Sequence, residues 1–139
     1  MADRYFTLDE ATATLRELRP VAERMVELHQ ALEDAATRRA TLRETVAGNG
    51  GGLVPTEIAE ADAEVEQLRA ALGAAVAKIQ SEGVEVKDLG LGLLDFPALR
   101  DDDEILLCWH VGEDEIRFWH RVEDGFAGRR PLPLDAGAD

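Results

Sequence analysis

Two stretches of the chain place mostly apolar residues at alternating spacings of three and four, and this pattern limits the possible folds more than any other feature. The first stretch runs through Leu18, Val21, Met25, Leu28, Leu32, Ala35, Arg39, Leu42 and Val46. The second runs through Ile58, Ala61, Val65, Leu68, Leu72, Ala75 and Ile79. Such spacing is a heptad seam, which predicts two long helices, each about 27 residues or ~40 Å in its regular part.

A glycine-rich segment at 47–55 separates the two seams and closes with Pro55, so it predicts a short loop. Residues 7–82 are then an antiparallel, coiled-coil-like helical hairpin. Its start is marked by Thr7 and Glu10, which fit a capping box. Pro20 removes a backbone donor and predicts a kink or a break in the first helix. No Lys-Ser/Thr pair follows the glycines, so a flexible turn is favoured over a phosphate-binding loop.

The flanks of both predicted helices are rich in alanine, which buries little surface. At about 25 cal/mol per Å² a two-helix hairpin is marginal on its own. A second copy packed against it would supply the missing apolar contact. We therefore expect a homodimer formed through the helices.

The segment 104–122 alternates apolar and polar residues on both sides of a polar break at 112–115, which predicts a β-hairpin. The expected register sets Val111 opposite Ile116, so that Trp109 faces Phe118 and Leu107 faces His120. One side of the hairpin is then core. The other carries Leu106, Cys108, His110, Arg117, Trp119 and Arg121 and is the expected ligand face.

The remaining segments complete a single α+β domain over 1–139, with a small antiparallel sheet within 84–122. Gly83 fits a helix C-cap, and residues 84–88 alternate like a short strand. The segment 89–97 predicts a turn and another short strand that Pro97 ends. The sheet would have three or four strands, and residues 123–139 would form a loop and a flexible tail.

Composition excludes several classes of function. The net charge is −14, which repels phosphate backbones and anionic lipid, so no nucleic-acid partner and no membrane association is expected. No apolar run approaches the roughly 18 residues of a membrane span. The start of the chain resembles no secretory signal, and the single cysteine fits a reducing compartment. These features predict a cytoplasmic protein.

The candidate ligand site is a pocket for an anion or small molecule on the polar face of the 104–122 hairpin. Arginine side chains next to an indole suit a carboxylate or phosphate head and a flat body. The residues expected to contribute are His110, Arg117, Trp119, Arg121, His120 and Arg129. Ion pairs between these arginines and nearby acids, such as Glu113 and Glu115, are the alternative interpretation.

A metal site for zinc or iron is a second alternative, from Cys108, His110 and His120 with Asp95 or Glu115. The expected register opposes it, because Cys108 and His110 would share one face while His120 points through the other. In that case His120 is a core histidine and Cys108 a small buried apolar residue. No resident cofactor and no catalytic residue is therefore predicted, and a nucleophile lacks a third group to orient its base.

Several short motifs resemble the prokaryotic family known as domain of unknown function 2203. They are the opening Tyr5-Phe6-Thr7-Leu8-Asp9-Glu10-Ala11, the stretches 86–89 and 92–98, the run Glu115-Ile116-Arg117-Phe118-Trp119-His120 and the segment 125–129. The resemblance spans nearly the whole chain except the glycine loop and the last few residues. It implies a small bacterial protein, of no assigned activity, and it carries over no catalytic residue.

Together these patterns favour a non-enzymatic, dimeric interaction or assembly module, whose helices pair with a second copy or another protein. The alternative is a protein, or a small enzyme, that binds a small molecule, an anion or a metal on the hairpin face. Metal content and stabilisation by added ligands would distinguish the two.

Overall fold

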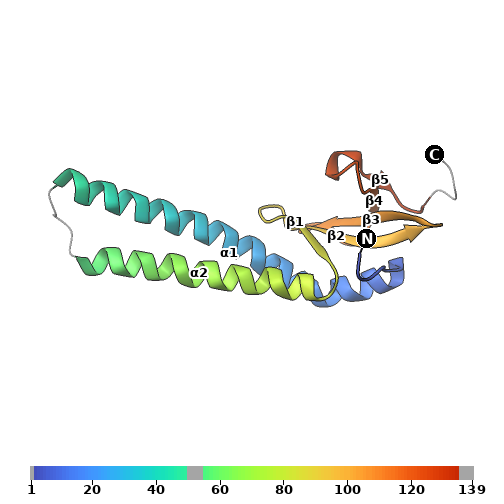
Figure 1. Ribbon diagram of the computed structural model, residues 1–139, viewed down its shortest axis with the longest axis horizontal. Coiled ribbons are helices and arrows are strands. Elements are labelled where there is room, and N and C mark those ends of the chain that lie inside the picture. The colour runs from blue at the N-terminus through green and yellow to red at the C-terminus, as the bar shows by residue number, and fades with distance from the viewer. Residues whose placement is uncertain (1, 50–54, 135–139) are drawn as a thin grey trace.

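The computed structural model describes residues 2–49 and 55–134 of the 139-residue chain. This part of the chain forms an α+β fold of two long helices and one five-stranded antiparallel sheet (Figure 1). The helices α1 (Leu8–Asn49) and α2 (Pro55–Ser81) lie side by side and extend away from the sheet. The predicted fold class, a helical hairpin with a small sheet from the C-terminal third, is therefore confirmed.

The start of α1 is fixed by the predicted capping box. The backbone N–H of Glu10 donates to Thr7 Oγ1 at 3.0 Å, and the N–H of Thr7 donates to Glu10 Oε1 at 2.8 Å. The helix continues through Pro20, so a break at that position is wrong. Pro20 is exposed, while Leu18 and Ala22 on either side of it are buried and hold the adjacent turns in place.

The other helix ends lie close to their predicted positions. α1 ends at Asn49, three residues beyond the predicted end at Val46, and the central part of the predicted glycine loop, 50–54, lies outside the described residues. Gly83 has φ +85° and its N–H donates to Gln80 O at 2.9 Å, which closes α2 in the predicted left-handed cap.

The sheet has five strands, whereas three or four were predicted. Its strands, in spatial as well as chain order, are β1 (Glu85–Asp88), β2 (Leu93–Arg100), β3 (Asp103–His110), β4 (Phe118–Arg121) and β5 (Arg130–Pro131). A short 3₁₀ helix, η1 (Phe126–Gly128), connects β4 to β5. The predicted loop after residue 123 is present and includes η1, but a flexible tail directly after it is wrong, because Arg130 pairs with Trp119. Residues 135–139 lie outside the described part.

β2 runs through Pro97, so the predicted strand end at this proline is wrong. The pairing with β1 reaches only as far as Asp95, and the missing N–H of Pro97 therefore costs no bond to that strand. The carbonyl of Pro97 accepts the N–H of Phe6 at 2.7 Å. The segment that precedes α1 is thus tied to the sheet.

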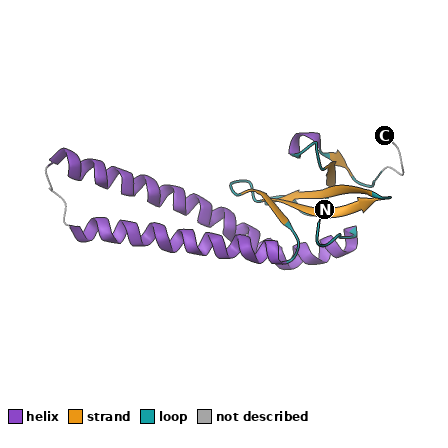
Figure 2. Ribbon diagram, viewed as in Figure 1, coloured by secondary structure: helices purple, strands orange, loops and turns teal. Residues whose placement is uncertain are grey.

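The main core lies between the first half of α1 and one face of the sheet (Figure 2). Trp109 and Trp119 from the sheet are 0% and 1% exposed. They share this core with α1 and α2 residues that include Leu15, Leu18, Met25, Leu72 and Ile79. Most residues of β2 and β3 are buried on both faces, so the second face of the sheet is also an interior surface.

Candidate functional site

The register between β3 and β4 differs from the predicted register by one residue. Leu107 lies opposite Trp119, and Cys108 lies opposite Phe118. The predicted pairs of Trp109 with Phe118 and of Leu107 with His120 are therefore wrong. Because side chains alternate along a strand, a shift of one residue moves every β4 side chain to the other face. Trp119 joins the core instead of the predicted ligand face, and His120 turns to the face of Cys108.

The long connection between β3 and β4 explains this shift. It spans residues 111–117. Trp109 Nε1 donates to Glu113 O at 2.9 Å. Arg19 on α1 donates from Nη1 to the same carbonyl at 3.0 Å and from Nη2 to Asp114 O at 2.6 Å. These bonds hold the connection against α1, and β4 begins at Phe118 rather than at Ile116.

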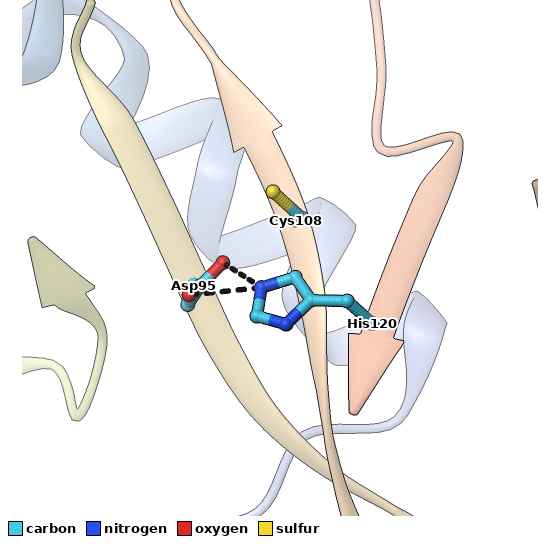
Figure 3. A group of neighbouring side chains, drawn as sticks. All are labelled: Asp95, Cys108 and His120. Atoms are coloured by element: carbon cyan, nitrogen blue, oxygen red, sulfur yellow. Dashed lines mark hydrogen bonds and ion pairs between the residues drawn. The ribbon is translucent and has the colours of Figure 1, made fainter. Parts of the chain in front are cut away.

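The new register brings together three side chains with metal-ligating and proton-transferring atoms, Asp95 on β2, Cys108 on β3 and His120 on β4 (Figure 3). Their ligand atoms all lie within 4.8 Å of one another. The three residues are 1%, 0% and 2% exposed. The prediction that Cys108 and His120 point through opposite faces is therefore wrong, and with it the geometric objection to a metal site.

Hydrogen bonds fix the orientation of the His120 ring. Nδ1 lies 2.7 Å from Arg121 O, and because a carbonyl only accepts, Nδ1 carries a proton. Nε2 therefore faces Asp95, whose Oδ1 and Oδ2 are both 3.2 Å away. The bond to Asp95, aided by one to Cys108, raises the pKa of His120 to about 10. Without metal, an imidazolium and a carboxylate thus form a buried ion pair.

Cys108 has the opposite character to an activated nucleophile. Burial raises the pKa of its thiol, and the hydrogen bond to His120 only partly opposes this effect. A nucleophilic triad needs one ring nitrogen of histidine for the nucleophile and the other for an orienting group. Here Nδ1 is bonded to Arg121 O, and Nε2 faces the Asp95 carboxylate. Because Asp95 also engages the His120 ring and burial raises the pKa of the thiol, Cys108 lacks the character of an activated nucleophile.

The other predicted ligand residues do not converge on one pocket. Arg117 is exposed and pairs with Glu115 at 3.7 Å. Arg129 donates to both carboxylate oxygens of Glu113, at 2.7 and 3.0 Å. Both contacts are of the kind that the alternative interpretation, pairing with nearby acids, expects.

His110 and Arg121 lie apart from the buried cluster. The His110 ring is half-buried, with Nδ1 2.8 Å from Val111 O and Nε2 3.7 Å from a carboxylate oxygen of Glu113. Arg121 lines a surface groove at the end of the β2–β3 hairpin together with Arg100. The structure therefore unites His120, Cys108 and Asp95, and leaves His110 and Glu115 outside.

Sequence reasoning named Glu113 only as an ion-pair partner for the arginines and missed its other contacts. Its carboxylate accepts the N–H of His110 at 2.9 Å and holds Arg129, while its carbonyl receives Trp109 and Arg19. This residue thus connects β3, α1 and the segment after η1. A glutamate in a polar turn after Gly112 gives no signal of such a role, because the partners come from distant parts of the chain.

Comparisons with known proteins give one match, which is to a protein family. No curated protein matches the chain, and no solved structure matches it. Within residues 2–49 and 55–134, neither helix combines the length and the apolar character needed to cross a membrane. Residues 4–132 match the family described as "Uncharacterized conserved protein (DUF2203)". Since the match covers nearly the whole chain, the protein belongs to this family of unknown function.

Proposed function

We propose that the protein is a non-enzymatic assembly module that pairs with a second copy of itself through the distal half of the helical hairpin. The support is the incomplete burial of the heptad seam. Ile79 near the sheet and Val65 further along α2 are both 0% exposed. Toward the tip, Leu42, Val46 and Ile58 are only half-buried. The two helices thus leave the seam near the tip partly exposed, and a bundle of four helices would cover it.

A groove between the two helices marks the surface that a second copy would cover. It has a volume of about 890 Å³ and its floor includes Leu42 of α1 and Ala61 of α2. Leu42 is an apolar seam residue that keeps contact with water. Covering it would bury more apolar surface, which stabilises by about 25 cal/mol per Å². An isolated pair of helices lacks this stabilisation.

Charge supports a second copy as the occupant. The α1 side of the distal hairpin carries Arg38 and Arg43, whose side chains remain 59% and 55% exposed although they pair with acids of α2. The α2 side of the groove carries Glu57 and Glu60. A two-fold axis across the groove would set α1 of one copy against α2 of the other. The basic stretch then meets the acidic stretch twice, which makes the surface self-complementary.

Light scattering after size exclusion tests this proposal on the full chain. We expect twice the chain mass for the wild type at micromolar concentration. Leu42→Glu should give monomers, because it places a charge in the paired seam. Ala70→Glu is the matched control, since Ala70 is exposed on α2 and is not among the groove residues. Its dimer should persist. A monomeric wild type at about 100 µM, far above a micromolar Kd, or a dimer unaffected by Leu42→Glu, would refute the proposal.

The proposed location is the cytoplasm. The support is the single cysteine, Cys108, which forms no disulfide within the chain, as is usual for proteins of a reducing compartment.

A further inference from the structure

We propose that Asp95, Cys108 and His120 form a closed binding site for one divalent transition metal ion, with Zn²⁺ as the expected ion. This site is independent of pairing through the hairpin. Each ligand stands on a different strand, so the ion would join β2, β3 and β4 on the buried face of the sheet that points away from α1. Ligands on paired strands are held more rigidly than ligands on loops, and rigid placement is what a metal site requires.

One distance between the ligand atoms suits a bound zinc ion as well as an ion pair. A charge-assisted N–H···O bond is normally about 2.7–2.9 Å long. His120 Nε2 lies instead at 3.2 Å from both carboxylate oxygens of Asp95. Two ligands at about 2.0–2.1 Å from tetrahedral zinc are separated by about 3.3 Å. The observed separation thus corresponds to the edge of a zinc tetrahedron.

The second ring nitrogen of His120 is held in the manner typical of metal ligands. Nδ1 donates to the carbonyl of Arg121 at 2.7 Å, which fixes the tautomer and aims Nε2 at the cluster. Asp95 lies directly across the β2–β3 pair from Cys108, so the carboxylate and the thiol leave the same face of the sheet side by side. No rearrangement of the backbone is needed to bring the three groups together.

The charges balance when the ion binds. Without metal, an imidazolium, a carboxylate and a neutral thiol sum to zero. Zn²⁺ would replace the proton on Nε2 and the proton on Sγ, and both protons would leave to solvent. The ion, the thiolate, the carboxylate and the neutral imidazole again sum to zero. The buried site therefore acquires no uncompensated charge, which would be costly at 0–2% exposure.

The donor set indicates the class of metal. One sulfur, one nitrogen and one carboxylate oxygen suit Zn²⁺ and exclude Mg²⁺ and Ca²⁺, which prefer oxygen alone. Among the described residues the cluster offers these three side chains, so a water or a backbone oxygen would complete a tetrahedron. Because all three side chains are buried, the site resembles closed structural sites rather than open catalytic ones.

Cobalt binding tests the proposal, with Co²⁺ alone as the probe. The full chain, made without a histidine tag, is refolded under reducing conditions after treatment with a chelator and titrated with Co²⁺. We expect one ion per chain, a d–d spectrum of tetrahedral intensity and a sulfur-to-cobalt charge-transfer band. Cys108 is the only cysteine of the chain, so this band identifies it without any substitution. Competition with Zn²⁺ should abolish the band.

Variants separate a ligand role from a structural one. Cys108→Ser should remove the charge-transfer band and weaken Zn²⁺ binding by more than roughly 100-fold, beyond the 10–100-fold effect of outer partners. His110→Ala is the control, because His110 extends from the same strand but lies outside the cluster. It should keep full binding. The proposal fails if refolded wild type takes up no stoichiometric Co²⁺ or Zn²⁺, if bound Co²⁺ shows no charge-transfer band, or if His110→Ala abolishes binding.

Discussion

Replacing Gly92 by alanine tests how closely the sheet and α1 are packed. Gly92 precedes β2 and has φ +66°, in the left-handed region that L residues disfavour. A Cβ atom there would lie against Cγ2 of Val111 and within 2.8 Å of Cγ2 of Val26 on α1. The substitution therefore combines backbone strain with overpacking between the sheet and the helix.

The cost of Gly92→Ala can be estimated from these two effects. The left-handed conformation costs about 1–2 kcal/mol, and an extra methyl group in a packed interior costs about 1–3 kcal/mol. We expect a loss of about 2–5 kcal/mol in the free energy of unfolding. Gly112 is the matched control, because it has φ +105° and nothing within 4 Å of its added Cβ. Gly112→Ala should cost only about 1–2 kcal/mol.

Urea unfolding followed by tryptophan fluorescence measures these differences, since Trp109 and Trp119 are both buried in the main core. Gly73→Ala provides a control of opposite sign. Gly73 is in α2 with open space around its added Cβ, so alanine should stabilise the protein by about 1 kcal/mol. If Gly92→Ala and Gly112→Ala cost the same, the contact with Val26 and Val111 is not tight and the packing described for this corner is wrong.

Three further predictions concern stability. In protein kept free of metal by a chelator, the contribution of the His120 ion pair is complete below about pH 6.5 and is lost as the pH rises towards 10, because folding raises the pKa of His120 from 6.5 to about 10. A urea midpoint that increases over this range would contradict that. Trp119→Ala should lower the free energy of unfolding by about 3–5 kcal/mol, whereas Arg117→Ala, at an exposed position, should lower it by less than about 0.5 kcal/mol. If the two variants shift the urea midpoint equally, the observed register is wrong. Thr7→Ala should lower the free energy of unfolding by about 1 kcal/mol through loss of the N-cap, and an unchanged thermal midpoint would count against that role.

Features that depend on neighbouring residues could be predicted from the sequence. Thr7 and Glu10 form a capping box three residues apart, and Gly83 ends α2 through a bond to Gln80. The heptad seams predicted both helices, and alternation predicted β3. All of these structures are stabilised mainly by contacts within a few residues, so the local pattern contains the information that determines them.

The register of β4, and with it the candidate site, was decided only by tertiary contacts. Hydrogen bonds from Arg19 of α1 and from Trp109 anchor the connection at Glu113, almost a hundred residues after Arg19. No local pattern records such a bond. Because side chains alternate on a strand, this one-residue difference moved His120 to the face of Cys108 and Asp95. The sequence by itself determined which groups are available, and long-range packing of the connection against α1 determined that three of them meet.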